Sequence, residues 1–274
     1  MPFFEFNGAK LHYETKGSGP AIVFVHAGIA DSRMWDDQWD VFAEHYQVIR
    51  YDARGFGQTV SADVEYANHD DIRALLDHLG IQKAALIGCS RGGQIAIDVI
   101  LANPERIWAY VSVCGGLSGF IWSSMPPNQH DALEEADRLF EAREWEAALE
   151  AEARIWVDGF YRTPDQVSKA VRDKMIAMNR QSLTHLAEGG RSITLDPPAV
   201  DRLAEIQCPV LITCGELDAS HVLARGNYLL KNIAAAEEYI FMNAAHLPSM
   251  EYPEEFNRVV LAFLSKAYNF DQLS

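Results

Sequence analysis

A short apolar run followed at once by a glycine-flanked serine constrains this chain more than any other feature. Residues 84–87 have the pattern of a buried strand, Gly-Cys-Ser-Arg-Gly follows at residues 88–92, and residues 93–101 have the pattern of a helix. A sharp strand-to-helix turn of this kind lifts a serine hydroxyl clear of the sheet in a strained conformation. Side chains at the two glycine positions would collide with neighbouring backbone. The pattern is that of a nucleophile elbow, and it predicts that Ser90 is a nucleophile.

Strand-like and helix-like segments alternate along most of the chain. An N-terminal hairpin turns at Asn7-Gly8 and joins residues 3–6 to residues 10–15. Further strand-like runs lie at residues 21–25, 46–51, 84–87, 108–113, 209–214 and 238–242, with helix-like segments at 34–45, 70–79, 93–101, 222–232 and 253–267. This order predicts an α/β fold whose mainly parallel sheet has about eight strands, with helices on both faces.

The alternation stops once, between residues 117 and 200. Helix-like segments occupy residues 131–143, 145–160 and 164–180 there, and no strand is expected. The chain is therefore predicted to divide into a core of residues 1–116 and 201–274 and a helical insertion of residues 117–200. We expect this helical insertion to lie as a cap, or lid, over the sheet edge that carries Ser90.

Length and charge limit the classes of function. With 274 residues, the chain can bury one large core and an insertion. A net charge of −16 argues against nucleic acids as partners and disfavours anionic membranes. No run of 18 apolar residues predicts a membrane span, and the first residues lack the pattern of a signal peptide, so a cytoplasmic protein is expected.

The sequence gives no sign of a metal or cofactor site. Its four cysteines, at positions 89, 114, 208 and 214, lack the spacing of a zinc site and are expected to be free thiols. Cys114 and Cys214 both end predicted strands and are expected to lie near each other, although a disulfide between them is disfavoured. We therefore expect chemistry that uses protein side chains alone.

A serine nucleophile needs a base, and the base needs an acid that orients it. His246 follows the strand-like run 238–242, and Asp218 follows the run 209–214, so both are predicted at the carboxyl edge of the sheet that carries Ser90. The order serine, aspartate, histidine fits this placement. His221 is a weaker candidate for the base, and Glu216 is a weaker candidate for the acid.

Several ordered motifs resemble the α/β-hydrolase fold superfamily over nearly the whole chain. They are the elbow, His26-Ala27-Gly28, Asp52-Ala53-Arg54-Gly55-Phe56-Gly57, Gly215-Glu216-Leu217-Asp218 and Ala245-His246-Leu247-Pro248. The chain is similar to the capped esterase and lactonase branch. The resemblance implies an oxyanion hole formed by the backbone N–H groups of Gly28 and Arg91. Ala27 stands where relatives usually have glycine.

Other side chains near these motifs receive structural roles. Cys89 is expected to point into the core, and His26 is expected to brace its loop. Asp52 and Arg54 are expected to pair with each other. The side chain of Arg91 is expected to be exposed or ion-paired, with contact to the insertion or to a substrate carboxylate as alternatives. An apolar substrate pocket is predicted to include Phe120, Trp122, Trp156 and Leu247.

These features predict a serine hydrolase of a small carboxylic ester or lactone, acting through an acyl-enzyme as a monomer or homodimer. The motifs leave other reactions on the same fold open: cleavage of a carbon–carbon bond in a β-diketone, hydrolysis of an amide or peptide, acyl transfer and perhydrolysis. A non-catalytic, receptor-like ligand-binding protein is the alternative from another class.

Overall fold

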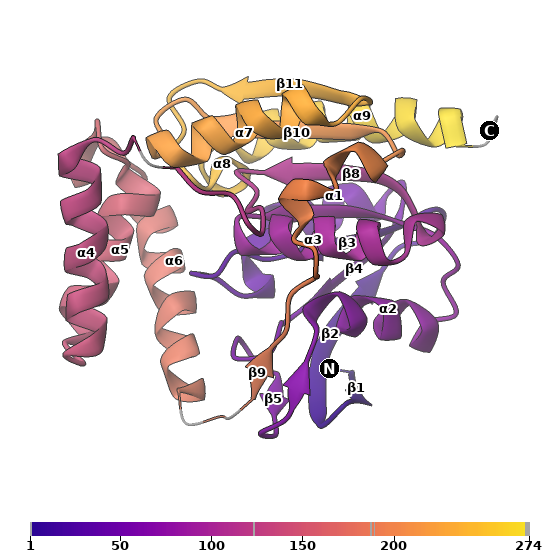
Figure 1. Ribbon diagram of the computed structural model, residues 1–274, viewed down its shortest axis with the longest axis horizontal. Helices are drawn as coiled ribbons and strands as arrows, with labels where there is room; N and C mark the ends of the chain where they lie inside the picture. The colour runs from indigo at the N-terminus through magenta and orange to yellow at the C-terminus, as the bar shows by residue number, and fades with distance from the viewer. Residues whose placement is uncertain (1, 123, 187, 189, 272–274) are drawn as a thin grey trace.

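The chain forms a nine-stranded, mainly parallel sheet with helices on both faces, as Figure 1 shows. The computed structural model describes residues 2–122, 124–186, 188 and 190–271. The main path of the sheet runs β1-β2-β4-β3-β7-β8-β10-β11, and β5 pairs with β2. The strands are β1 (Phe3–Phe6), β2 (Ala9–Lys16), β3 (Ala21–Val25), β4 (Gln47–Tyr51), β5 (Val60–Ser61), β7 (Ala84–Cys89), β8 (Ile107–Val113), β10 (Val210–Gly215) and β11 (Ala236–Phe241). The predicted fold class is confirmed.

The strand pairing follows from the sequence pattern. β1 and β2 pair antiparallel across Asn7 and Gly8, which adopt the positive φ angles that a tight hairpin turn requires. From β4 through β3, β7, β8 and β10 to β11, all neighbouring strands are parallel. β3, β7 and β8 are buried along their whole length, which explains why they are continuously apolar in sequence. The loops that follow these parallel strands therefore meet at one edge of the sheet.

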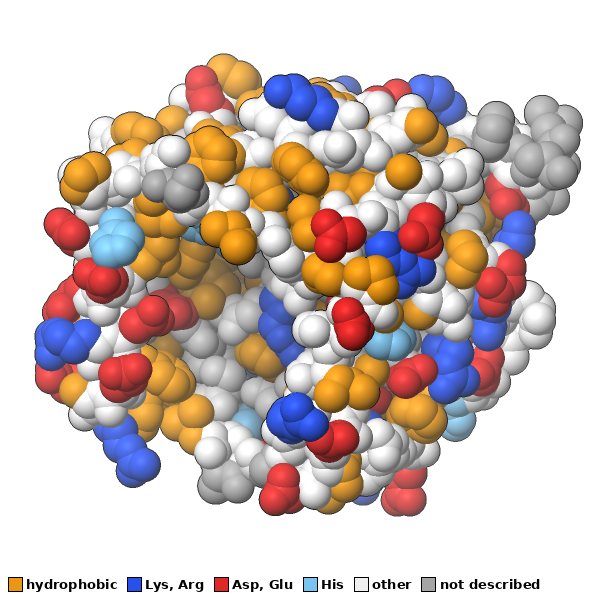
Figure 2. Space-filling view, in the orientation of Figure 1, with side chains coloured by type: hydrophobic (Ala, Val, Ile, Leu, Met, Phe, Trp, Pro, Cys, Tyr) orange, Lys and Arg blue, Asp and Glu red, His pale blue; other side chains and the backbone are white. Residues whose placement is uncertain are grey.

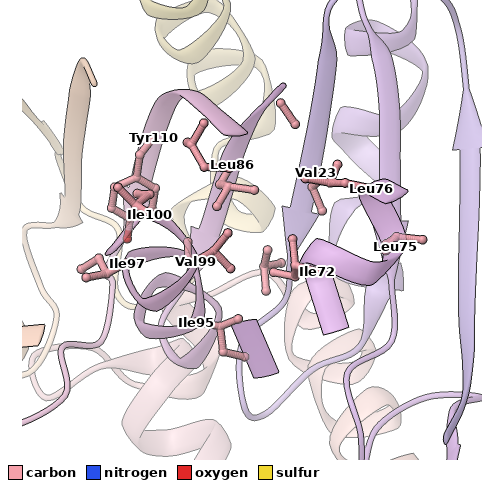
Figure 3. Packing of buried hydrophobic residues seen from close by; sticks show 14 of the residues in the cluster. Val23, Ile72, Leu75, Leu76, Leu86, Ile95, Ile97, Val99, Ile100 and Tyr110 are labelled. Atoms are coloured by element: carbon pink, nitrogen blue, oxygen red, sulfur yellow. The ribbon is translucent and has the colours of Figure 1, made fainter. Parts of the chain in front are cut away.

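Helices cover both faces of the sheet and bury its apolar side chains. They are α1 (Asp36–Ala43), α2 (Asn68–His78), α3 (Arg91–Ala102), α7 (Ser220–Asn232), α8 (Pro248–Glu251) and α9 (Pro253–Asp271). Figure 3 shows the packing of α2 and α3, in which Ile72 and Val99 belong to one cluster with Val23 and Leu86 of the sheet. A second cluster, on the opposite face, includes Trp35 and Phe256. This packing fixes the carboxyl edge of the sheet on which the predicted catalytic residues depend.

The helical insertion consists mainly of α4 (Pro127–Glu141), α5 (Trp145–Ala153) and α6 (Lys169–Ser182). Figure 1 shows these three helices together at the left of the molecule, beside the sheet rather than on one of its faces. Two of the predicted helices are shorter than expected: α5 passes into a π-helical turn at Arg154–Asp158, and a 3-10 turn at Pro164–Gln166 precedes α6.

The expectation that this segment contains no strand is wrong in one detail. Arg191–Ser192 forms the two-residue strand β9, which pairs with β6 (Glu65–Tyr66). Such a short exposed pair leaves no hydrophobic periodicity in the sequence.

Among the described residues, no helix combines the length and the apolar character needed to cross a membrane.

Candidate active site

The turn between β7 and α3 holds Ser90 in a strained conformation. Ser90 has φ 52° and ψ −116°, which side chains rarely adopt. A Cβ atom at Gly88 would overlap the carbonyl of Gly92, and one at Gly92 would overlap the carbonyl of Val25. The Ser90 N–H donates to the carbonyl of Val113 at 2.9 Å, which ties the turn to β8. Both glycines are therefore required by close backbone approach, and Ser90 itself is half-buried.

His246 and Asp218 lie together at the same edge of the sheet. The Nδ1 atom of His246 is 2.7 Å from Oδ2 of Asp218, and both side chains are buried, with exposed fractions of 2% and 0%. The second carboxylate oxygen, Oδ1, accepts the Ala219 N–H at 2.7 Å. The carboxylate therefore orients the imidazole so that Nε2 is the nitrogen left for another partner. Among the described residues, Ser90 makes no hydrogen bond with that ring; catalytic bonds of this kind are often long before substrate binds.

The helical insertion contacts the histidine directly. Trp156, in the π-helical turn after α5, places its ring centroid 4.5 Å from that of His246. Its carbonyl also accepts the His246 N–H at 3.2 Å. The insertion thus helps to hold the histidine in place.

The two backbone N–H groups that the sequence predicts as an oxyanion hole have no hydrogen-bond acceptor in the described chain. They belong to Gly28 and Arg91. The loop that carries Gly28 is braced by His26, whose Nδ1 donates to the carbonyl of Ala27 at 2.8 Å and whose Nε2 accepts the Ala53 N–H at 3.0 Å. Burial lowers the pKa of His26, which favours this neutral, bracing form.

The alternative candidates for nucleophile, base and acid lie in environments that do not suit those roles. Cys89 is fully buried in the core, and burial raises the pKa of its thiol far above the usual value, so a thiolate is disfavoured there. His221 opens α7, and burial lowers its pKa to about 4. Glu216 accepts the N–H of Asn243 rather than contacting His246. The geometry thus favours His246 and Asp218 over these alternatives.

Two clusters of metal-ligand residue types occur among the described residues. Cys114, Asp218 and His246 bring ligand atoms within 4.8 Å of one another, and so do the exposed His130, Asp131 and Glu134. In the first cluster, burial and a hydrogen bond with Cys214 raise the pKa of the Cys114 thiol, and a metal would need the thiolate. Exposed acidic clusters such as the second are common on acidic surfaces. Neither cluster therefore supports a metal site.

A cavity of about 420 Å³ lies between the helical insertion and the core. Figure 2 shows this face hollowed between the two parts. Gly28, Gly55 and Phe56 form its core wall, whereas Ser90 does not line it directly. The insertion supplies mostly apolar walls together with a few polar groups; among them are Phe140, Trp145, Leu149, Glu152, Leu183, His185 and Leu186. The cavity therefore reaches the loop that carries one of the two available N–H groups.

The predicted pocket residues lie elsewhere. Phe120 packs on Tyr228 at 5.4 Å and joins the core, Leu247 is fully buried among core residues, and Trp122 is 41% exposed. Trp156 contacts His246 but is not part of the cavity wall. None of the four side chains therefore lines this cavity, and their place in a substrate pocket stays a prediction, because apolar character alone does not show which surface a side chain meets.

Residues of the insertion were missed as cavity residues. Phe140 and Leu186 are apolar yet 44% and 51% exposed, and that exposure is invisible in sequence. Phe56 lies between two glycines, and this is the one signal in the sequence, since its immediate neighbours carry no side chains that could cover it. The expected pairing of Asp52 with Arg54 is also wrong. Asp52 bonds His12 at 3.0 Å, and Arg54 makes two bonds of 2.8 Å with Asp71.

Comparison with known proteins assigns the chain to a family. A family model described as the alpha/beta hydrolase family matches residues 22–259. The chain belongs to the alpha/beta hydrolase family. It is a hydrolase of this family with a serine at the elbow. The resemblance predicted from the motifs is confirmed.

Relatives within the family act on different substrates. The 2-hydroxy-6-oxononadienedioate/2-hydroxy-6-oxononatrienedioate hydrolase of Burkholderia vietnamiensis is 29% identical, over 94% of this chain and 91% of that protein. The 3-oxoadipate enol-lactonase 2 of Acinetobacter baylyi is 25% identical, over 97% and 99%. The structure of Est816, described as an N-acyl homoserine lactone degrading enzyme, has a TM-score of 0.76 and 27% identity, over 96% and 100% of the two chains.

Proposed function

We propose that this alpha/beta hydrolase cleaves a small carboxylic ester or lactone through an acyl-enzyme on Ser90. The 2.7 Å bond between the buried His246 and Asp218 is the observation that carries the proposal. It orients an imidazole at the sheet edge that also carries Ser90, which the elbow holds in a strained, half-buried position. A nucleophile, a base and an orienting acid are the three groups that acyl transfer to a serine requires.

The proposed reaction has two halves. Ser90 Oγ attacks the carbonyl carbon while Nε2 of His246 accepts its proton, and the oxyanion receives hydrogen bonds from the N–H groups of Gly28 and Arg91. The carbon–oxygen bond to the leaving alcohol then breaks as His246 returns the proton to that oxygen. A water molecule, deprotonated by the same imidazole, attacks the acyl carbon. The bond from that carbon to Ser90 Oγ then breaks as His246 returns the proton to Oγ, which releases the acid and the free serine. Asp218 stabilises the imidazolium in each half.

Two lactone-cleaving relatives support the ester or lactone assignment. Enol-lactonase 2 of Acinetobacter baylyi matches nearly the whole chain, and Est816 shares its fold at 27% identity. The apolar cavity beside Gly28 supports it as well, since its volume of about 420 Å³ suits a small organic substrate. The helical insertion would then act as the cap of the site.

Cleavage of a carbon–carbon bond in a β-diketone-like substrate is the second candidate. It is favoured by the similarity to the oxo-dienedioate hydrolase of Burkholderia vietnamiensis. Both reactions would use the same serine and the same histidine, so the catalytic geometry does not separate them. The leaving group separates them, because it is an alkoxide in one case and a carbanion equivalent in the other.

A substrate panel tests the proposal. Purified protein is assayed against 4-nitrophenyl acetate, butyrate and hexanoate, several γ- and δ-lactones, an acyl homoserine lactone and a β-diketone. We expect turnover of at least one ester or lactone class, with Ser90→Ala as the inactive control. Turnover of the β-diketone alone would replace the proposal by the second candidate. Absence of turnover on every substrate would contradict both.

A further inference from the structure

Arg91, the residue after the proposed nucleophile, has an incompletely bonded guanidinium group. Its Nη2 atom donates to Oδ1 of Asn68 at 3.1 Å. Its Nη1 atom is buried and has no hydrogen-bond partner within the described ranges. No carboxylate of the described residues lies at ion-pair distance from it. This surrounding is unusual for an arginine, because buried guanidinium groups are normally paired with a carboxylate or fully hydrogen-bonded.

A second buried donor without a partner lies near this group. Tyr51 is the last residue of β4, at the sheet edge that also carries the elbow, and it is 1% exposed. Its hydroxyl has no hydrogen-bond partner among the residues described. Burial raises the pKa of Tyr51, and the nearby positive charge of Arg91 opposes that rise. The two side chains are thus close enough to interact electrostatically, and both have unused donors.

The neighbouring acidic residue is already engaged elsewhere. Asp71 acts electrostatically on both Arg91 and Tyr51, but it forms two hydrogen bonds of 2.8 Å with Arg54 in a buried ion pair. The first turn of α3, which begins at Arg91, contains no acidic residue. The partial positive charge at this helix N-terminus therefore adds to that of the guanidinium. The guanidinium of Arg91, the hydroxyl of Tyr51 and the N-terminus of α3 thus combine hydrogen-bond donors with positive potential. No carboxylate of the described residues is bonded to either side chain.

Arg91 is partly exposed and adjoins residues that line the substrate cavity. The guanidinium of Arg91 lies 4.9 Å from the ring centroid of Phe56, and its side chain packs beside Gly28. Phe56 and Gly28 both line the cavity between the core and the insertion. In Figure 2, basic side chains come to the surface on the core side of the hollow. A ligand in the cavity thus has contact with residues that touch the guanidinium.

We propose that the Arg91 guanidinium and the Tyr51 hydroxyl bind a carboxylate group of the substrate. The inference rests on the proposed function and specifies it: the preferred ester or lactone carries a carboxylate. A carboxylate is planar, accepts several hydrogen bonds and matches the fork of a guanidinium. A bound carboxylate would satisfy the unpartnered donors and neutralise a charge that has no counter-ion in the described chain.

Matched esters test this carboxylate site. Mono-4-nitrophenyl esters of succinate, glutarate and adipate are compared with the uncharged butyrate, valerate and hexanoate esters of equal chain length. We expect the charged-to-uncharged ratio of kcat/KM to fall about tenfold or more in Arg91→Gln at the best chain length. The ratio falls less in Tyr51→Phe and partly recovers in Arg91→Lys. Arg258→Gln, which removes an exposed arginine of α9, leaves it unchanged. An equal ratio in wild type and Arg91→Gln at all three lengths would overturn the proposal.

A binding measurement separates this inference from the proposed reaction. Calorimetric titration of the Ser90→Ala protein compares mono-methyl glutarate with dimethyl glutarate, which lacks the charge. Tighter binding of the mono-methyl ester, lost when Arg91→Gln is added, supports the carboxylate site whether or not esters are turned over. Equal binding of the two ligands overturns it even if esters are hydrolysed.

Discussion

Replacing Asp218 by asparagine should cost most of the activity, for a reason that the hydrogen bonds specify. In the native protein Oδ1 accepts the Ala219 N–H, and Oδ2 accepts the proton on Nδ1 of His246, both at 2.7 Å. If the asparagine oxygen keeps the bond to Ala219, its NH₂ group faces Nδ1 of the histidine. The histidine proton must then move to Nε2, and Nε2 can no longer accept the proton of Ser90.

The opposite orientation of the amide is also unfavourable. Its NH₂ group would face the Ala219 N–H, and a buried donor without an acceptor costs about 1–3 kcal/mol. The charge that stabilises the imidazolium is lost in both orientations. The same exchange in a serine protease lowers kcat by about 10⁴. We therefore expect kcat for Asp218→Asn to fall by about 10³–10⁴.

The assay is kcat on 4-nitrophenyl butyrate at pH 7.5, with folding checked by circular dichroism. Asp98→Asn is a matched control, because it makes the same chemical change at another buried carboxylate, on α3. That control should retain activity within about twofold, since it leaves the His246 bond untouched. A kcat for Asp218→Asn within tenfold of wild type would refute the role assigned to this aspartate.

Two further predictions concern the elbow and a buried acid. Gly92→Ala should lower the free energy of unfolding by about 3 kcal/mol, because its Cβ overlaps backbone of β3. A thermal melt should show a larger fall in Tm than Gly80→Ala, where no atom lies within 4 Å and the positive φ of 68° alone costs about 1 kcal/mol. Burial raises the pKa of Asp98 from 3.8 to about 6, so the folded chain binds its proton more tightly and stability falls as pH rises between those values. Asp98→Asn should therefore stabilise the protein above pH 6, by up to about 3 kcal/mol in denaturant titrations, and a pH-independent difference would contradict this.

The sequence sufficed for the sheet and for the loops at its carboxyl edge. Ser90, Asp218 and His246 each follow a short apolar run, and the topology of a parallel sheet brings the ends of such runs to one edge. Close backbone approach at the elbow also leaves a local signal, the two glycines. These features depend on neighbours in sequence or on a regular repeat, and both can be read from a single chain.

Contacts between distant segments left no such signal. Arg54 pairs with Asp71, across two different elements, although Asp52 is nearer in sequence. The cavity wall formed by Phe140 and Leu186 depends on how the insertion sits beside the core. Helical periodicity identifies an apolar face, but it does not say what that face meets. For the same reason, the sequence does not show that Phe120 and Leu247 pack against core residues.

Labelling with a fluorophosphonate tests the central claim, that Ser90 is an activated nucleophile, most directly. The probe forms a covalent bond only with a serine whose hydroxyl is activated by a base. Intact-mass measurement and peptide mapping should show one adduct, on the peptide that contains Ser90, and none in Ser90→Ala. An unlabelled wild-type protein that is correctly folded, or an adduct on another residue, would contradict the account.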